Sequence, residues 1–298
     1  MQIVVDDNTG GRIDNYLFDK IDKSRSKIQS MIKNGYIKVN NVNVKVSYVV
    51  KCDDVIDIDE PDVEDNTIKA ERMDLDIVYE DEDVIVVNKA NGVVVHPAIG
   101  NNSGTLVNGL LYHSKSLSSI NGEFRPGIVH RIDAYTTGLL MVAKNDKAHE
   151  FLARQLEEKT VHRKYIALVW GVIKNDTGTI DAPIGRDSSD RKKMAVTANN
   201  SKSAVTHFKV LERYKNATLI ELVLETGRTH QIRVHMNYIG FPIINDSVYG
   251  RRKIIDDSGQ CLHAKELGFI HPKSGEFMMF NSDLPACFLK ILNQLKED

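Results

Sequence analysis

Apolar residues recur at helical spacing in the first part of the chain. This spacing predicts a short helix over residues 12–21 and a second helix that begins after Ser24 and ends at Gly35. Serine is favoured at a helix N-terminus because its hydroxyl accepts a free backbone N–H, and glycine is favoured just beyond a C-terminus. The residues expected to face a core are Ile13, Leu17 and Ile21 in the first helix and Ile28, Met31 and Ile32 in the second.

An alternating pattern follows and predicts a small sheet. Residues 36–39 and 42–46 form two alternating runs, and Asn40 and Asn41 stand between them, which is typical of a tight hairpin. A further strand is predicted over residues 55–58. Two helices, a hairpin and a closing strand are enough for a self-contained module.

From residue 76 onwards, strands and helices are mixed without regular alternation. The chain has no glycine-rich nucleotide-binding motif, so the pattern does not support a doubly wound parallel fold. We therefore predict an α+β fold with a mixed, largely antiparallel sheet. Strands are expected over 77–90 (two, around an acidic turn), 139–144, 164–173, 203–213 and 217–225, and helices over 104–114, 146–159 and 229–238.

Charge is distributed unevenly along the 298 residues, although the net charge is only −2. Residues 20–51 contain eight Lys or Arg and one acidic residue, Asp22, whereas the charged residues of 53–65 are all acidic. A local basic patch can contact phosphates even on a nearly neutral protein, but charge alone fits a solvated surface better. The acidic stretch with Pro61 indicates a linker and a domain boundary near residue 70.

The sequence shows no sign of a membrane segment or a secretion signal. It contains no apolar run of about 18 residues, and its start lacks the basic and apolar regions of a signal peptide. Cys52, Cys261 and Cys287 form no CxxC pair, which argues against a zinc ribbon or a dithiol redox site. We therefore expect a cytoplasmic protein.

Three polar stretches carry the candidate chemistry. GIVHRIDAYTTGLLMVAK places Asp133 in a loop before a hydrophobic strand, HRKYIALVWG places Tyr165 near the start of a strand, and ETGRTHQIRVHM clusters cations at a loop-to-helix junction. Taken singly, these features fit a turn residue, a core aromatic and a phosphate clamp equally well. The candidate residues are His130, Arg131, Asp133, Tyr165, Arg228, His230, Arg233 and His235.

Together, HRIDAYTTG, RKYIALVWG and TGRTHQIRVHM resemble the three signature motifs of the RluA family of RNA pseudouridine synthases. VVNKANGVVVHPAIGN and LHAKELGFIHP fit the same family, so the resemblance runs from about residue 75 to 285. SRSKIQSMIKNGYIKVN, followed by CDDVIDI, resembles the alpha-L RNA-binding module, which completes an RluD-like arrangement. The resemblance implies an RNA-binding module over 1–65, an acidic linker over 66–75 and a catalytic domain over 76–298.

The resemblance also implies an isomerase that detaches uracil from ribose, turns it and rejoins it through carbon, with neither cofactor nor metal. The implied catalytic residues are Asp133, Tyr165, which packs against the target base, and Arg233, which pairs with Asp133. Arg131 is implied to help extract the base from the RNA. Further substrate contacts are expected from His130, Arg228 and His230 and, in the module, from Arg25 and Lys27.

The family implies RNA as the partner, with 23S ribosomal RNA favoured as substrate and tRNA as the alternative; a monomer is the default expectation. Two departures from the family pattern stand near the site. Tyr135 replaces an acidic residue that most members carry, and Ala90 replaces a frequent proline. Two other functions stay open: an RNA-binding protein with little activity, and an N-glycosylase that uses Asp133 as nucleophile. Product analysis separates the latter, because a glycosylase releases free uracil.

Overall fold

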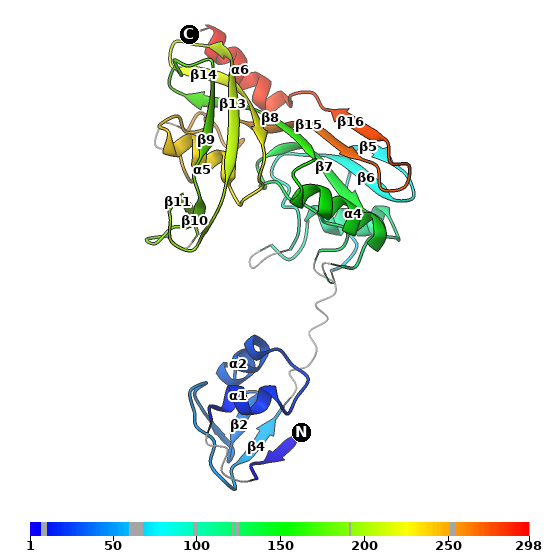
Figure 1. Cartoon of the computed structure of the whole chain (residues 1–298), viewed down its shortest axis with the longest axis vertical. Coiled ribbons are helices and arrows are strands. Elements are labelled where there is room, and N and C mark those ends of the chain that lie inside the picture. Colours follow the sequence, from blue (N-terminus) through cyan, green and yellow to red (C-terminus); the bar gives the residue numbers. More distant parts are fainter. Residues whose placement is uncertain are drawn as a thin grey trace. The chain divides into compact units, whose positions relative to one another are not determined.

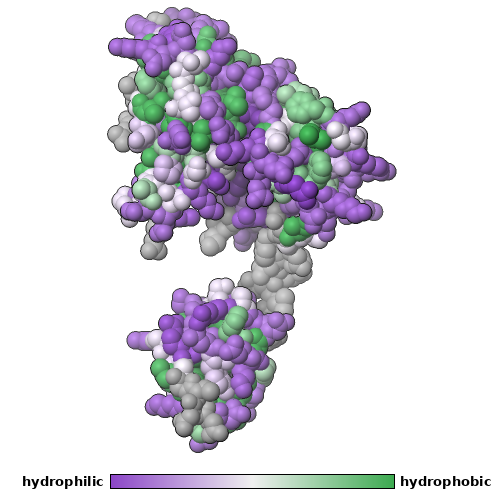
Figure 2. Space-filling model, in the orientation of Figure 1, coloured by the Kyte–Doolittle hydropathy of each residue, from purple (hydrophilic) through white to green (hydrophobic). Residues whose placement is uncertain are grey.

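The computed structural model describes residues 1–6, 11–59, 68–97, 101–120, 122, 125–190, 192–250 and 254–297. The chain divides into two compact units, Met1–Asn66 and Thr67–Asp298, each with its own hydrophobic core (Figure 1). On the face drawn in Figure 2, hydrophilic residues dominate the surface of both units, and hydrophobic residues form small separate groups. Within the described residues, no helix is long and apolar enough to cross a membrane.

The first unit packs two helices against a four-stranded antiparallel sheet with the strand order β1-β4-β2-β3. The predicted helices, hairpin and closing strand are all present, and the Ser24 hydroxyl accepts the backbone N–H of Lys27 at 3.4 Å. Asn40 and Asn41 have positive φ angles, as a two-residue hairpin turn requires. The elements are β1 (Gln2–Val4), α1 (Ile13–Phe18), α2 (Arg25–Lys33), β2 (Ile37–Val39), β3 (Val42–Asn43) and β4 (Val55–Ile58).

A nine-stranded sheet forms the centre of the second unit and confirms the predicted α+β fold (Figure 1). Its strands run in the order β5-β6-β7-β15-β8-β14-β13-β9, and β16 also pairs with β15. All pairs are antiparallel except β7 with β15, which is parallel. The strands are β5 (Ile77–Glu80), β6 (Val84–Lys89), β7 (Thr137–Ala143), β8 (His162–Trp170), β9 (Thr177–Asp181), β13 (Val205–Arg213), β14 (Ala217–Leu224), β15 (Leu262–Ile270) and β16 (Phe277–Asn281).

A small sheet and four helices complete the second unit. The small sheet has the order β11-β10-β12, and β11 contacts α5. The three predicted helices correspond to α3, α4 and α5, whereas β9 to β12, β15, β16 and α6 have no counterpart among the predicted elements. The bounds are β10 (Ile184–Arg186), β11 (Met194–Val196), β12 (Ser201–Lys202), α3 (Leu106–His113), α4 (Asp146–Glu157), α5 (Gln231–Tyr238) and α6 (Ala286–Glu297).

Both faces of β6 are covered, which explains why this strand is hydrophobic at nearly every position. Ile85 and Val87 belong to the core that contains α3, whereas Val84 and Val86 belong to the core that contains α4. Successive side chains of a strand point to opposite faces, so a continuous apolar run indicates burial on both sides. The neighbouring strand β7 divides its residues between the same two cores and so gives firm support to the polar loop that precedes it.

Residues 68–75 lie along α3 of the second unit. The Lys69 carbonyl accepts a hydrogen bond from Nδ2 of Asn108 at 2.8 Å, and the Glu71 N–H donates to the Asn108 carbonyl at 3.0 Å. The predicted domain limits stay predictions. The contacts nevertheless attach most of the segment predicted as a linker to the second unit.

Gly138, the second residue of β7, lies where β7 meets β15. Its φ angle is +106°, and a Cβ at this position would overlap the backbone carbonyl of Ala264. Glycine tolerates this combination because it has no side chain. The contact brings the two strands together directly after the loop that contains Asp133.

We expect Gly138→Ala to lower the free energy of unfolding by about 3 kcal/mol or more, because backbone strain adds to overlap with a backbone atom. The matched control is Gly92→Ala. There φ is +78°, but no atom lies within 4 Å of the added Cβ, so a loss of about 1–2 kcal/mol is expected. Urea denaturation measures both variants, and equal losses would contradict a close approach at Gly138.

Candidate active site

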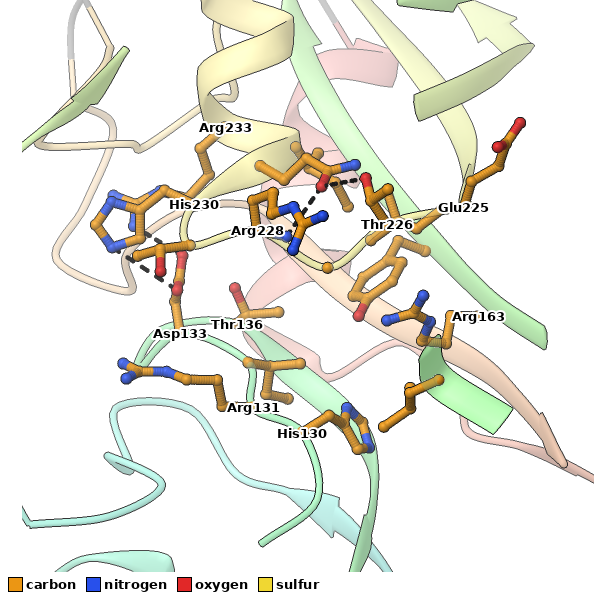
Figure 3. Close-up of a pocket in the computed structure, with 18 of the residues that line it drawn as sticks. His130, Arg131, Asp133, Thr136, Arg163, Glu225, Thr226, Arg228, His230 and Arg233 are labelled. Carbon is orange, nitrogen blue, oxygen red and sulfur yellow. Dashed lines mark hydrogen bonds and ion pairs between the residues drawn. The ribbon is translucent and has the colours of Figure 1, made fainter. Parts of the chain in front are cut away.

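A pocket of about 600 Å³ opens in the second unit. Its walls come from the loop before β7, the start of β8, and the stretch from the end of β14 into α5 (Figure 3). Arg25 and Lys27 are exposed on α2, in the first unit. The pocket brings together the other candidate residues of the sequence analysis except His235: His130, Arg131, Asp133, Tyr165, Arg228, His230 and Arg233.

Asp133 lies in the loop before β7, and 17% of its side chain is exposed. Nη1 of Arg233 donates to Oδ2 of Asp133 at 2.9 Å, so the expected pairing of these two residues is present (Figure 3). The Thr136 N–H donates to the Asp133 carbonyl at 3.0 Å and tightens the loop. The Arg233 guanidinium thus fixes one oxygen of the Asp133 carboxylate, and the carboxylate still faces the pocket.

A second carboxylate, that of Asp246, also binds Arg233. The contact is bidentate, with 2.7 Å between Nε and Oδ2 and 2.9 Å between Nη2 and Oδ1, and the Asp246 side chain is fully buried. Burial alone would raise the pKa of Asp246, but hydrogen bonds and charge from Arg233, with the N–H groups of Tyr249 and Val248, lower it. Burial would lower the pKa of Arg233, but the two carboxylates raise it.

His230 forms the N-cap of α5 in a left-handed conformation with φ +57°, which strains the backbone. The Tyr249 hydroxyl accepts the backbone N–H of Met194 at 2.9 Å, and the same oxygen lies 2.7 Å from Nδ1 of His230. The other ring nitrogen of His230, Nε2, lies 3.8 Å from Oδ1 of Asp133. Burial lowers the pKa of His230, although Asp133 opposes this shift, which favours the neutral ring.

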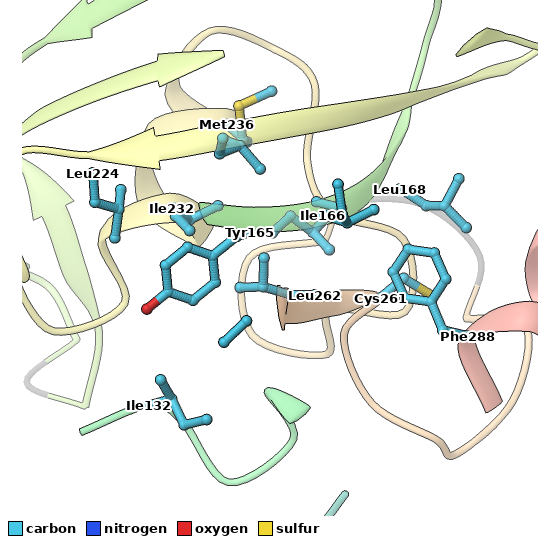
Figure 4. Packing of buried hydrophobic residues seen from close by; sticks show 14 of the residues in the cluster. Ile132, Tyr165, Ile166, Leu168, Leu224, Ile232, Met236, Cys261, Leu262 and Phe288 are labelled. Atoms are coloured by element: carbon cyan, nitrogen blue, oxygen red, sulfur yellow. The ribbon is translucent and has the colours of Figure 1, made fainter. Parts of the chain in front are cut away.

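Tyr165 presents an aromatic ring at the inner wall of the pocket. Its side chain is buried, and the hydroxyl points away from the apolar cluster (Figure 4). Burial raises the pKa of the hydroxyl; Arg163 acts to lower it and Asp133 to raise it. Tyr165 is therefore a neutral phenol between two opposite charges. The apolar residues around the ring are Ile132, Leu224, Ile232 and Leu262.

Lys89 and His130 hold the Asp133 loop and the strand that follows it through hydrogen bonds with backbone atoms. Lys89 is only 2% exposed, and its pKa falls to about 7 because of burial, although Asp133 opposes this shift. His130 accepts the Met141 N–H on Nε2 at 3.1 Å, and burial lowers the pKa of His130 to about 3, so the ring is neutral. The Lys89 ammonium donates, at 2.7 to 2.9 Å, to the carbonyls of Ala90, Val93 and Ala134.

The other candidate cations are more exposed. Arg131 is exposed, and its Nη1 lies 3.4 Å from Nε2 of His96. Arg228 is half-buried, and its Nε donates to the Ser203 carbonyl at 3.0 Å. Tyr135 is 47% exposed and packs against Gly259. The side chains best placed to meet an entering polyanion are therefore the two arginines.

Three residues that the sequence analysis did not single out belong to this site: Lys89, Arg163 and Asp246. Strand alternation could have indicated Arg163, because it stands two positions before Tyr165 on β8 and hence on the same face. No spacing relates Asp246 to Arg233, because a loop after α5 brings it back. Asp246 provides a second carboxylate beside Asp133, although Tyr135 stands where most family members carry an acidic residue.

Comparison with known protein families gives a match in each unit. Residues 83–238 match the family described as RNA pseudouridylate synthase. Residues 11–56 match the S4 domain, which agrees with the predicted N-terminal RNA-binding module. The resemblance stated from the motifs is confirmed.

Individual relatives align over most of the chain. A Bacillus subtilis protein named as the uncharacterized RNA pseudouridine synthase YlyB is 55% identical over 288 residues, covering 96% of this chain and 95% of that protein. Ribosomal large subunit pseudouridine synthase D of Pseudomonas aeruginosa is 42% identical, covering 92% and 88%. Among solved structures, human RNA pseudouridylate synthase domain containing 1 is similar with a TM-score of 0.58 at 28% identity, covering 76% of this chain and 96% of that one.

We expect Asp246→Asn to lower the free energy of unfolding by about 3–5 kcal/mol, because it removes one member of a buried ion pair. The matched control is Asp176→Asn, which breaks the exposed pair of Asp176 with Arg213 and should cost less than about 1 kcal/mol. Urea denaturation at neutral pH measures both variants. A loss at Asp246 no larger than that of the control would show that the buried pair does not stabilise the fold.

Proposed function

Because the chain belongs to the RNA pseudouridylate synthase family and is an isomerase that acts on RNA, we propose that it converts specific uridines of 23S ribosomal RNA to pseudouridine. The choice of RNA is supported by relatives such as the ribosomal large subunit pseudouridine synthase D of Pseudomonas aeruginosa. The proposal places the protein in the cytoplasm, where such RNA is assembled into ribosomes.

The observation that carries the proposal is the carboxylate of Asp133, held by Arg233 in a pocket beside Tyr165. The reaction must break the bond between ribose C1′ and uracil N1, turn the base and join C1′ to C5. A positioned carboxylate can attack covalently or stabilise the positive charge that develops on the sugar. Arg233 keeps this group in a fixed orientation, so little reorganisation is needed when the charge appears.

The target base must leave its stack to reach Asp133, which costs a few kcal/mol. We assign Arg131 to the space that the base leaves, because its side chain is exposed and adjacent to the catalytic loop. Tyr165 offers a ring on which the extruded uracil can pack. His230 presents Nε2 and Arg228 a guanidinium to the same pocket, whereas His130, with Nε2 engaged, retains only Nδ1 for a substrate contact.

The S4 domain supplies a second RNA contact in this proposal. Arg25 and Lys27 are exposed on α2, whereas Ile28, Met31 and Ile32 of the same helix are buried. Nε of Arg25 lies 3.9 Å from Oδ2 of Asp14, which orients its side chain weakly. These cations can bind phosphates without reading sequence.

Asp133→Asn should abolish modification, because the amide can neither attack as an anion nor stabilise positive charge. Pseudouridine mapping of total RNA from cells that carry the wild-type gene, the variant gene or no gene tests this. The expected result is the loss of the same 23S sites with the variant and the deletion, and normal modification with the control Asp176→Asn. Modified 23S sites in the Asp133→Asn cells would remove Asp133 from its role, and loss of tRNA sites instead would contradict the 23S assignment.

Reversal of the charges on α2, Arg25→Glu with Lys27→Glu, should weaken RNA binding, because two phosphate contacts are replaced by repulsion. Binding of the 23S fragment at several salt concentrations measures it, and the slope of log K against log salt should fall by about 2. The control pair, Lys174→Glu with Lys215→Glu, changes the same charge at exposed positions of the second unit and away from the pocket. If both pairs weaken binding equally, α2 makes no specific contact.

A further inference from the structure

Arg163 is a buried cation for which the described part of the chain supplies no hydrogen-bond or ion-pair partner. It is 7% exposed, it lines the pocket, and it makes no hydrogen bond or ion pair with any residue that the structure describes. Its Nε is completely shielded from solvent and still has no acceptor. Arg233, which is equally buried, differs because it binds two carboxylates.

Strand β8 and Gly227 together determine the position of this guanidinium beside Tyr165. Arg163 and Tyr165 are two residues apart on β8, so their side chains share the face that forms the inner wall of the pocket. The space for the guanidinium exists because residue 227 is glycine. A Cβ at Gly227 would lie 2.8 Å from Nη1 of Arg163.

An unpaired buried guanidinium costs free energy, because arginine cannot lose its proton under ordinary conditions. Such a cost is tolerated where a ligand supplies the missing partner. The nearby carboxylate of Glu225 is already engaged, at 2.8 Å by His207 and at 3.1 Å by Lys159. The missing partner is therefore expected to enter the pocket with the substrate.

We propose that Arg163 binds a carbonyl oxygen of the target uracil and stabilises the negative charge that this oxygen carries once the base is detached from ribose. The proposal rests on the proposed roles of Tyr165 and Asp133. A base that packs on Tyr165 lies beside Arg163 and deep in the pocket. Backbone phosphates, in contrast, stay near the exposed cation Arg131.

The charge balance of the reaction explains why such a cation is useful. When the C1′–N1 bond breaks, both electrons stay on the uracil, and the charge spreads over N1 and the two carbonyl oxygens. Asp133 meets the positive charge on C1′. After the base has turned, C5 supplies the electron pair of the new C1′–C5 bond; the C5 proton then leaves to solvent, and N1 takes up a proton. Arg163 would bind a negative charge that exists only after uracil is detached from ribose. Such a preformed donor accelerates cleavage of the C1′–N1 bond more than it strengthens binding of the RNA.

The test uses the RNA that the wild-type protein modifies in the mapping experiment, so the outcome does not depend on which RNA that is. Arg163→Gln should lower the single-turnover rate by about 10²-fold, while the Kd for RNA changes less than about threefold. Arg163→Lys, which retains the charge, should recover part of the rate. The control Lys174→Gln removes an exposed cation that does not line the pocket and should leave the rate within about threefold.

A second readout separates charge stabilisation from folding. 5-Fluorouridine at the target position has no C5 proton to lose, so the rate is followed as the disappearance of the original nucleoside. Fluorine itself stabilises the detached anion, and the rate loss of Arg163→Gln should therefore be smaller than with uridine. An equal loss with both bases would overturn the proposal. So would a weaker Kd with a reduced salt slope and an unchanged rate, which would make Arg163 a phosphate ligand instead. Inactivity of the wild-type protein on every RNA would count against the proposed function and not against Arg163.

Discussion

The guanidinium of Arg233 must satisfy two carboxylates at once, and the arrangement of the site depends on this constraint. Asp246 is fully buried and has its charge balanced by Arg233 and by backbone amides. Asp246 accepts hydrogen bonds from Nε and Nη2 of Arg233, and Nη1 is the nitrogen that donates to Asp133. The direction of the Asp133 carboxylate is therefore set by buried groups of the protein itself. For the role that we propose for Asp133, such preorganisation is what electrostatic catalysis requires.

The loop that carries Asp133 is held by contacts of quite different kinds. Gly138 lets β7 approach β15 closely, Lys89 gathers three backbone carbonyls around one ammonium, and His130 accepts a strand N–H. A loop fixed by backbone contacts can vary its exposed side chains without moving Asp133. This explains how Tyr135, with its ring at the surface, can replace an acidic residue and leave the ion pair with Arg233 in place.

The sequence predicted the elements whose pattern is local. Periodicity and caps were sufficient for α1 to α5 and for the strands β2 to β8, β13 and β14. The motifs indicated which residues line one pocket, with the exception of His235. The strands β15 and β16 and the helix α6 have no counterpart among the predictions, although β15 lies at the centre of the large sheet. Asp246 was missed because its importance comes from a contact with Arg233 across 13 residues of chain. Arg163 shows the opposite case, in which an available signal, strand alternation, was not used.

The hydrogen bonds of Tyr249 link the small sheet to the protonation state of the pocket. The Met194 N–H at the start of β11 occupies one lone pair of the tyrosine oxygen, and Nδ1 of His230 lies 2.7 Å from the same oxygen. When the tyrosine proton is directed to Nδ1, the neutral histidine carries its own proton on Nε2, which lies 3.8 Å from Oδ1 of Asp133. A ring in this tautomer has no lone pair facing the pocket and cannot take up a proton there, whereas the opposite tautomer can. The direction of one tyrosine proton therefore decides whether His230 can act as a base.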